Sequence, residues 1–291
     1  MARFIRSKTL VSAIRNAPDP FFGLWYNLNL YRGCEHGCIY CDSRSKCYGL
    51  GELNDIRIKE NALELLEKEL KSKRKRGTIG FGSMNDPYMP IEKEIQFSRG
   101  ALEIICLHRF PVHIITKSNL VCRDADLLGK IGKIYAAVSI TITTVDDSIS
   151  KRIEPGAPVS SERFEALHEL NKQGVYAGVC LMPVLPFITD NEQSLIHLIE
   201  KAKKFGAQYI LICPGMTLRE GQREYFYKEL DKKFPGVREL YQKKYGNNYS
   251  CSIPNGNKIW KTLQSRCAEI ELPTQMKFYK AENIVQGKLF H

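Results

Sequence analysis

The sequence predicts an α/β fold, a partial (βα)6 barrel of the TIM type with a helical and then irregular C-terminal extension. Six short apolar segments alternate with helical patterns over residues 25–215, and this alternation is typical of parallel βα units. Six units are too few for an eight-strand barrel, which favours an open barrel with its site at the C-terminal strand ends. A doubly wound open sheet is the alternative architecture.

The first units occupy the chain up to residue 116. Residues 26–32 are predicted to form the first strand, and a helix at residues 60–73 follows because three of its leucines repeat on one face. Short apolar runs at residues 78–83 and 112–116 predict the second and third strands. Ser98 is expected to cap the helix between these two strands.

The later units follow the same order. A short helix near residues 124–128 precedes the fourth strand at residues 134–142. Ser160 or Ser161 is expected to cap the next helix. This helix should end before Gly174, because glycine readily adopts the left-handed conformation that follows many helices.

The last two strands are predicted at residues 175–185 and 209–214, on either side of a helix at residues 191–205 that Gly206 ends. The expected organisation is an N-terminal extension, a barrel core and a C-terminal extension that packs on the barrel, at residues 1–24, 25–215 and 216–291.

The composition favours a globular protein of the cytoplasm. Apolar residues make up 43% of the 291 residues, which is enough for a sizeable core. The sequence contains no apolar run of about 18 residues, so no membrane span is predicted, and the first residues show no secretory signal. Ten cysteines without an export signal are expected to be reduced thiols, with a subset used for metal binding or catalysis.

A net charge of +11 favours a polyanionic partner. Residues 68–77 hold six Lys or Arg residues, and residues 232–250 hold five more among aromatic residues. Such segments are typical of nucleic-acid binding proteins. The alternative for the first segment is a solvated helix end, where cations meet the negative end of the helix dipole.

Three cysteines, Cys34, Cys38 and Cys41, follow the first predicted strand with the spacing C-x3-C-x2-C. Three interpretations of these cysteines are open: they are unconnected thiols, they form a structural zinc site, or they are the ligands of an iron–sulfur cluster. Zinc prefers four ligands, so a distant cysteine or His36 would have to complete a zinc site. His36 lies between two of the cysteines in the chain, so a closed site with His36 as the fourth ligand would be cramped. A four-iron cluster on three thiolates keeps one iron open, and an open position is typical of chemistry rather than of structural support.

This motif, with Tyr40 before its last cysteine and a (βα)6 pattern around it, resembles the radical S-adenosylmethionine (SAM) superfamily. The resemblance implies that Cys34, Cys38 and Cys41 hold a [4Fe-4S] cluster, whose open iron is chelated by the amino and carboxyl groups of SAM. It also implies an enzyme. The cluster donates one electron, SAM is cleaved to a 5′-deoxyadenosyl radical, and this radical removes a hydrogen atom from the substrate.

Further motifs resemble spore photoproduct lyase and its DNA repair photolyase-like relatives. They extend roughly from Trp25 to Tyr241 and read YRGCEHGCIYC, GSMNDPYMPIE, ITKSNLVCRDADLL, VSITITTVDDSISKRIEPGAPVSSERFEALHELNKQGV and MPVLPFITD. This narrower resemblance implies a lyase or modifying enzyme that acts on a nucleic acid or nucleotide.

The resemblance also implies which residues contact SAM. Tyr40 would lie beside the adenine, and Ser83, Asn85 and Asp86 would offer acceptors to the methionine amino group. Asn-Asp-Pro is also a common turn sequence. Lys117 ends the third strand, where a lysine is suited to pair with the methionine carboxylate, and an exposed lysine is the alternative.

Ser139 and Thr141 alternate along the fourth strand, so they share one face, which points either inward to the site or outward to the helices. Polar residues inside a barrel strand are expected to contact a ligand, here SAM. Glu154, in the segment RIEPGAP, either accepts hydrogen bonds from the ribose of SAM or is a surface carboxylate.

One position departs from the family pattern. Spore photoproduct lyase carries a cysteine near the end of its second strand that returns a hydrogen atom to the product radical, and this chain has Ser83 at the matching place. A serine O–H bond is too strong to be a ready hydrogen donor, which puts the lyase reaction on a thymine dimer in doubt. Tyr88 is the candidate replacement relay, with packing in the core as the alternative.

Seven further cysteines remain. Cys213, Cys251 and Cys267 could hold a second cluster, although no two of them have the spacing C-x2-C. The apolar surroundings of Cys106, Cys122 and Cys180 are typical of buried cysteines, and Cys47 follows the cysteine loop.

The sequence thus predicts a radical SAM enzyme of a nucleic acid or nucleotide, with a reductant such as flavodoxin or ferredoxin as partner. Radical chemistry on a peptide or small molecule is one alternative. A zinc-dependent nucleic-acid binding module and an electron-transfer protein are alternatives from other classes. Zinc modules are usually much smaller than six βα units, and an open ligand position argues against simple electron transfer.

Overall fold

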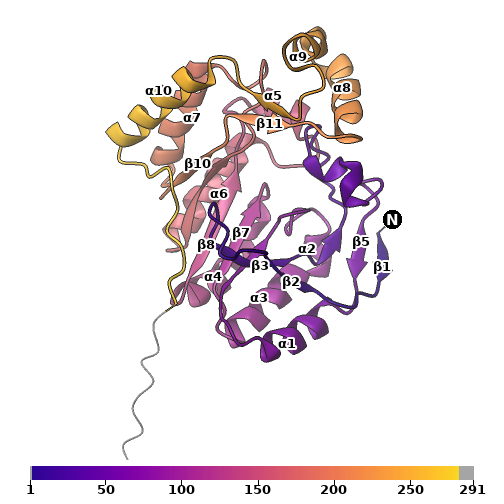
Figure 1. Ribbon diagram of the computed structural model, residues 1–291. Coiled ribbons are helices and arrows are strands. Elements are labelled where there is room, and N and C mark those ends of the chain that lie inside the picture. Colours follow the sequence, from indigo (N-terminus) through magenta and orange to yellow (C-terminus); the bar gives the residue numbers. More distant parts are fainter. Residues whose placement is uncertain (1, 282–291) are drawn as a thin grey trace, which may run out of the picture.

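The computed structural model describes residues 2–281 and is built around one seven-stranded sheet (Figure 1). Six strands of this sheet run parallel, namely β3, β6, β7, β8, β9 and β10, and β2 pairs with β3 in the antiparallel direction. From one edge to the other the strands are β10 (Ile210–Ile212), β9 (Tyr176–Leu181), β8 (Ala136–Thr141), β7 (Val112–Thr116), β6 (Thr78–Phe81), β3 (Leu24–Leu28) and β2 (Val11–Ala13).

The strands of this sheet lie side by side in the same order in which they follow one another along the chain. In the described part of the chain, the strand order therefore never reverses. A doubly wound sheet has a reversal point, which makes that alternative wrong. The α/β prediction is confirmed. The order is that of a singly wound, open sheet with β10 and β2 as its edges.

Helices connect the parallel strands and pack on the sheet. β7 and β8 are buried almost throughout, as expected for strands that are covered on both faces. α1 buries Leu66 and Leu70 and packs on α3, in agreement with the leucine pattern. The connecting helices are α1 (Ala62–Ser72), α2 (Glu92–Ile95), α3 (Phe97–Leu107), α4 (Ala125–Gly132), α5 (Asp147–Ile153), α6 (Ser160–Lys172) and α7 (Glu192–Lys204).

Two predicted helix caps are wrong. Ser98 lies inside α3, and its backbone N–H donates to a carboxylate oxygen of Glu92 at 2.8 Å. The N-cap of α6 is Val159, whose N–H donates to Glu162 at 2.8 Å, so neither Ser160 nor Ser161 caps that helix. In both cases a carboxylate satisfies an N–H group near the helix start, a role that the serine hydroxyl was expected to fill.

The predicted helix ends are confirmed. Gly174 and Gly206 follow α6 and α7 with φ angles of 77° and 90°, in the region that favours glycine.

The segment predicted as one strand at residues 26–32 is divided between two sheets. β3 ends at Leu28, and the short strand β4 (Tyr31–Arg32) pairs instead with β5 (Arg57–Lys59). β5 also pairs with β1 (Arg3–Ile5), which gives a small sheet of order β1-β5-β4. Buried and half-buried residues alternate from Tyr26 to Leu30, but Leu30 and Tyr31 are both buried, so the alternation shifts by one residue where the chain changes sheet.

The C-terminal segment carries a small antiparallel pair and three helices (Figure 1). β11 (Gly215–Thr217) pairs with β12 (Ser250–Ser252), and α8 (Gln222–Lys233) and α9 (Val237–Tyr245) lie between them in the chain. α10 (Gly256–Glu269) packs on α7. The Ile210 N–H donates to Pro273 O at 2.8 Å, which ties the following segment to the edge strand β10.

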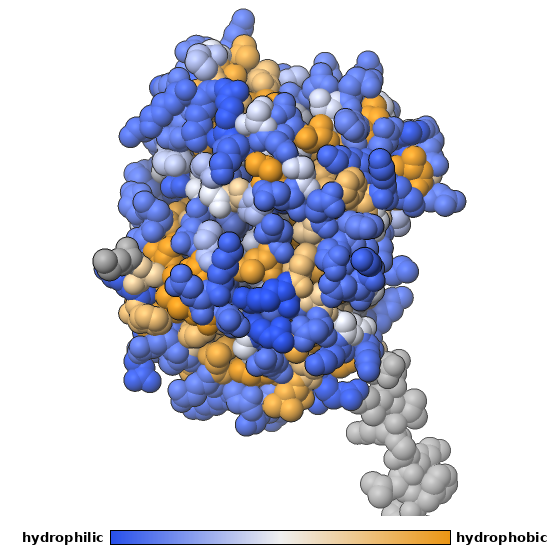
Figure 2. Space-filling view, turned by 180° about the vertical axis from the view of Figure 1, so that it is seen from behind, coloured by the Kyte–Doolittle hydropathy of each residue, from blue (hydrophilic) through white to orange (hydrophobic). Residues whose placement is uncertain are grey.

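Within residues 2–281, no helix is both long enough and apolar enough to span a bilayer. Figure 2 shows one face of the molecule, where hydrophilic side chains cover most of the surface and apolar residues form patches among them.

Candidate functional site

A cavity of about 700 Å³ lies where the parallel strands end. Phe81, Thr141 and Cys180 line it from or near the C-terminal ends of β6, β8 and β9. The C-terminal segment lines it too, through residues of β11, β12 and α8. α/β folds place their sites at the carboxyl ends of parallel strands, so this cavity is the candidate active site.

The loop after β4 brings the predicted cluster cysteines to this cavity. Cys41 lines it, Cys38 is buried, and Cys34 and Cys41 are partly exposed. Burial raises the pKa of Cys34 to about 12, with further contributions from Asp86 and Cys41, and burial also raises the pKa of Cys38. The Cys34 and Cys38 thiols are therefore protonated when free, and a metal must displace their protons on binding.

The three thiols fit an iron–sulfur cluster better than a closed zinc site. Three thiolates of a four-iron cluster bind three different irons, so they need not converge on one point. Among residues 2–281, no group of three or more His, Cys, Asp or Glu side chains is arranged for a single ion. His36 is occupied on both ring nitrogens, since Nδ1 lies 3.2 Å from Gly156 O and Nε2 lies 3.0 Å from Asp86 Oδ2.

The turn after α5 packs directly on the cysteine loop. The Gly156 N–H donates to His36 O, and the Ile39 N–H donates to Ile153 O, both at 2.9 Å. A Cβ atom at Gly156 would overlap the backbone oxygen of Glu35, so only glycine fits without a shift of the loop. The glycine of this turn is thus explained by close backbone packing.

Glu154 is fully buried, so its interpretation as a surface carboxylate is wrong. Glu154 Oε2 lies 2.6 Å from Arg163 Nη2, and Glu154 Oε1 accepts hydrogen bonds from the hydroxyls of Tyr40 and Thr143. Burial by itself raises the pKa of Glu154, but Arg163 and Lys117 bring it below its ordinary value. Glu154 is therefore a buried, charged group behind Tyr40, and its contact with ribose stays a prediction.

Tyr40 and Lys117 connect this buried network to the cavity, which both residues line. Lys117 Nζ lies 5.7 Å from the centre of the Tyr40 ring. Burial by itself lowers the pKa of Lys117, but the negative charge of a Cys38 thiolate and of the Glu154 carboxylate raises it above its ordinary value. Lys117 thus presents a partly buried positive charge at the cavity, which suits the predicted pairing with a ligand carboxylate.

Of the predicted acceptors after β6, Ser83 alone lines the cavity. It is exposed, and its hydroxyl donates to Asn29 Oδ1 at 3.4 Å. Asn85 is buried and donates to Tyr31 O at 2.7 Å, which fixes the strand before the cysteine loop.

Asp86 holds the local backbone together. One carboxylate oxygen accepts from the Tyr88 N–H and the Thr116 hydroxyl, at 2.9 and 2.6 Å, and the other accepts from the Lys117 N–H at 2.7 Å. Asp86 is buried and does not line the cavity. The hydrogen bond from the Tyr88 N–H is that of a turn, the alternative interpretation of this segment, whereas Thr116 and Lys117 lie at the end of β7. Contact of Asp86 with SAM stays a prediction.

Ser139 and Thr141 share one face of β8, and only Thr141 lines the cavity. The Ser139 hydroxyl lies 2.8 Å from His113 Nε2 and 2.8 Å from the Tyr209 hydroxyl. These three buried residues form a polar cluster one pleat away from Thr141.

The buried His113 predicts a pH dependence of stability. Burial lowers its pKa to about 3, from an ordinary value of 6.5, because the charged ring loses its hydration. The folded protein binds fewer protons than the unfolded chain between these values, so stability falls as the pH drops below 6.5. We expect this group to remove about 2 to 3 kcal/mol from the free energy of unfolding between pH 6.5 and about pH 4.5.

Urea unfolding of the wild type and of His113→Gln at both pH values checks this. The variant has no titrating ring, so its free energy of unfolding should fall less than that of the wild type. His197→Gln removes an exposed histidine and should behave as the wild type. An equal fall in the wild type and in His113→Gln would contradict the role of His113.

Tyr88 lies in the core and does not line the cavity. It is fully buried, its hydroxyl donates to Asp124 Oδ2 at 3.0 Å, and the Arg123 guanidinium lies 5.8 Å from its ring centre. Tyr88 is therefore a packed core residue, as the alternative interpretation expected, and its position does not support the relay role.

The candidates for a second cluster lie in three different places. Cys213 lines the cavity, Cys251 is buried on β12 among residues of α8 and α9, and Cys267 packs from α10 into the main core. Their separation does not support a shared cluster. Cys180, expected to be a buried apolar residue, is buried and also lines the cavity.

The cavity is also lined by residues of distant segments that the sequence did not predict. Phe22 enters from the N-terminal extension, and Met216 from β11. Gln222 of α8 donates to Tyr40 O and to Thr217 O, both at 2.9 Å, and so joins the C-terminal segment to the cysteine loop. Pro183, after a cis peptide bond, and Pro214 carried a local signal, since proline after a buried strand marks a chain turn.

Comparison with known proteins identifies a family and several relatives. The family model described as "Radical SAM superfamily" matches residues 28–199, more than half of the chain. An uncharacterised protein of Methanocaldococcus jannaschii is 31% identical, over 78% of this chain and 83% of its own length. The "Radical SAM Nalpha-GlyT isomerase" of Pseudomonas phage M6 is 25% identical, over 62% of this chain and 37% of its own length.

Solved structures share the fold. Spore photoproduct lyase complexed with dinucleoside spore photoproduct superposes with a TM-score of 0.68 at 15% identity, over 92% of this chain and 79% of that chain. A radical S-adenosylmethionine methyltransferase from Kitasatospora setae, with cobalamin and a [4Fe-4S] cluster bound, gives 0.56 at 11% identity, over 89% and 54%. At these identities the likeness shows the fold alone.

Proposed function

Because the chain belongs to the radical SAM superfamily, a family of enzymes that use SAM and a [4Fe-4S] cluster, we propose that Cys34, Cys38 and Cys41 hold that cluster and that the substrate is a nucleic acid or nucleotide. The observation that carries the proposal is the cavity at the strand ends, which Cys41, Tyr40 and Lys117 line together. When bound, the cluster supplies the electron that cleaves SAM reductively and so generates a radical for hydrogen abstraction from the substrate.

The chain's own residues bind and orient the ligand in this proposal. Lys117 pairs with the carboxylate of SAM, because its charge is maintained by Glu154 and Cys38. Tyr40 presents its ring to the adenine, and its hydroxyl is held by Glu154. Apolar side chains such as Phe22 and Met216 limit access of water to the cavity, which protects reactive intermediates from side reactions.

Charge supports a nucleic-acid substrate, although not through the segment at residues 68–77. That segment ends α1 and immediately precedes β6, so it lies at the amino ends of the strands, away from the cavity. Residues 68–77 therefore match the alternative interpretation, a solvated helix end. The second basic segment leads into β12, which lines the cavity. Among similar proteins, the phage relative is named an isomerase of Nalpha-GlyT, and the lyase of similar fold is complexed with a dinucleoside.

The first experiment tests the chemistry. The protein is purified without oxygen, loaded with iron and sulfide, and mixed with dithionite and SAM, and 5′-deoxyadenosine is then measured. We expect formation of 5′-deoxyadenosine by the wild type and its loss in a variant with Cys34, Cys38 and Cys41 all changed to alanine. Cys47→Ala removes an exposed cysteine close in the chain and should retain activity. A colourless, zinc-loaded protein that leaves SAM intact would favour the zinc-dependent binding module.

The substrate class is tested separately. Addition of DNA or RNA oligonucleotides should increase 5′-deoxyadenosine formation, and high salt should abolish the increase, because phosphate contacts are screened by salt. Radical chemistry on a peptide or small molecule predicts little salt dependence. Flavodoxin or ferredoxin should replace dithionite as the reductant.

A further inference from the structure

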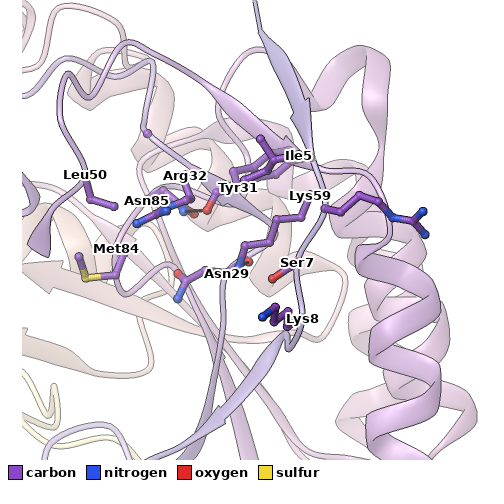
Figure 3. Close-up of a pocket in the computed structure, with 12 residues that line it drawn as sticks. Ile5, Ser7, Lys8, Asn29, Tyr31, Arg32, Leu50, Lys59, Met84 and Asn85 are labelled. Atoms are coloured by element: carbon purple, nitrogen blue, oxygen red, sulfur yellow. Dashed lines mark hydrogen bonds between the residues drawn. The ribbon is translucent and has the colours of Figure 1, made fainter.

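A groove beside the small sheet gathers positive charge next to the candidate active site (Figure 3). It has a volume of about 370 Å³ and lies between the loop after β1, the strands β4 and β5, and the segment after β6. Four of its lining residues are cations, Arg6, Lys8, Arg32 and Lys59, and none of its lining residues is an aspartate or glutamate.

Most of this charge has no counter-ion. Within residues 2–281, Lys8 and Arg32 make no ion pair and no side-chain hydrogen bond, and Arg6 has one exposed pair, with Glu60 at 3.5 Å. Lys59 is partly buried and donates to the backbone oxygen of Asn29 at 2.6 Å. Burial lowers the pKa of Lys59, and the nearby Arg32 lowers it further, while the charge of Glu69 offsets part of this shift. An anion in the groove would relieve this repulsion.

The groove is held in place by protein contacts. Asn61 clamps the loop after β1, because its side chain accepts from the Ser7 N–H and donates to Ser7 O, both at 2.9 Å. The Lys59 N–H donates to Leu30 O at 3.2 Å, which fixes β5 against the chain before β4. The cations therefore project from an ordered framework, and little chain entropy is lost when a ligand binds.

The groove adjoins the cavity. Met84 lines both of them. Ser83, which lines the cavity, donates to Asn29, which lines the groove. A ligand that fills the cavity could therefore extend into the groove.

We infer that the groove binds a phosphate group of a nucleic-acid strand, adjacent to the nucleotide that enters the cavity for reaction. The inference rests on the proposed nucleic-acid substrate and gives it a binding subsite. Arginine and lysine are the side chains that contact phosphate most often, and the planar guanidinium of Arg32 suits two of its oxygens. A strand that presents one base to the cavity carries its next phosphodiester only a few ångströms away, which matches two adjoining sites.

The test measures binding of a labelled single-stranded oligothymidylate by fluorescence anisotropy over a series of salt concentrations. The variant carries Lys8→Ala and Arg32→Gln together, and it is expected to fold because neither side chain has a partner in the described chain. The control carries Lys130→Ala and Lys133→Ala, which remove the same charge from exposed positions around the end of α4, before β8. Thermal unfolding confirms that both variants are folded.

We expect the groove variant to bind about tenfold more weakly or worse at low salt. We also expect the slope of log K against log salt to become less negative by about 1.4, because two contacts to a single strand contribute about 0.7 each. The control should keep the affinity and slope of the wild type. Equal weakening by both variants, unchanged binding by the groove variant, or displacement of the oligonucleotide by polyglutamate as readily as by unlabelled oligonucleotide would overturn the inference.

This result is separable from the proposed chemistry. SAM cleavage without substrate should be unchanged in the groove variant, since the groove cations lie outside the cavity lining. A wild type that forms 5′-deoxyadenosine and binds neither DNA nor RNA would overturn the groove assignment and the nucleic-acid substrate, but not the SAM chemistry. Oligonucleotide binding that is equal in the wild type and the groove variant would overturn the groove assignment alone. Normal oligonucleotide binding without SAM cleavage would overturn the proposed chemistry alone.

Discussion

Replacing Arg163 with methionine is expected to lower the free energy of unfolding by about 3 to 5 kcal/mol. Arg163 and Glu154 are both fully buried, and their charged atoms lie 2.6 Å apart. Arg163 also donates to Pro158 O at 2.8 Å and to Thr141 O at 3.0 Å. Methionine fills much of the same volume but leaves the Glu154 charge and two carbonyl groups unpaired, and urea unfolding at neutral pH measures the loss.

Two further variants isolate the cause. Combining Arg163→Met with Glu154→Gln removes the uncompensated charge and should recover part of the stability. Arg238→Met breaks an exposed pair with Asp231 and should change the free energy of unfolding by less than about 0.5 kcal/mol. A similar loss for Arg163→Met and Arg238→Met would show that burial of the pair is not the reason.

Changing Gly156 to alanine is expected to remove about 1 to 3 kcal/mol of stability and to lower the iron content after cluster loading by more than half. The added methyl group would overlap the backbone oxygen of Glu35, so the cysteine loop has to move away from the turn after α5. That loop carries Cys34 and Cys38 on either side of the contact, and thiolates that shift relative to one another hold a cluster less well. Iron and sulfide analysis of the loaded protein gives the content, and urea unfolding gives the stability.

The matched control is Gly129→Ala. Gly129 lies inside α4 with open space where a Cβ would be, so alanine should stabilise the protein by about 0.5 to 1 kcal/mol. Its iron content should equal that of the wild type. Full iron loading in Gly156→Ala would show that the contact with Glu35 does not position the cysteines.

These two predictions concern one structural unit. Glu154 and Gly156 are neighbours in the chain, and the Glu154–Arg163 pair and the Gly156 backbone both lie beside the cysteine loop. Glu154 holds the hydroxyl of Tyr40, and Gly156 holds the backbone of His36. The RIEPG segment therefore positions the candidate cluster site without lining the cavity itself.

The sequence by itself determined the features that depend on local spacing. Apolar periodicity predicted the parallel strands and most of their helices, since a residue's neighbours along the chain decide which face it presents. The loop with Cys34, Cys38 and Cys41 was also predictable from the sequence, because its three candidate ligands lie within eight residues. Glycine predicted the ends of α6 and α7 for the same local reason.

Only the tertiary structure decided what each polar side chain contacts. The segment RIEPGAP reads equally well as a surface turn, and the burial of Glu154 depends on Arg163 of the next helix and Tyr40 of a distant loop. The groove cations come from residues 6, 8, 32 and 59, which β1, β4 and β5 bring together by pairing into a second sheet. Periodicity shows which residues avoid water, but the partner of a buried charge depends on long-range packing that no local pattern encodes.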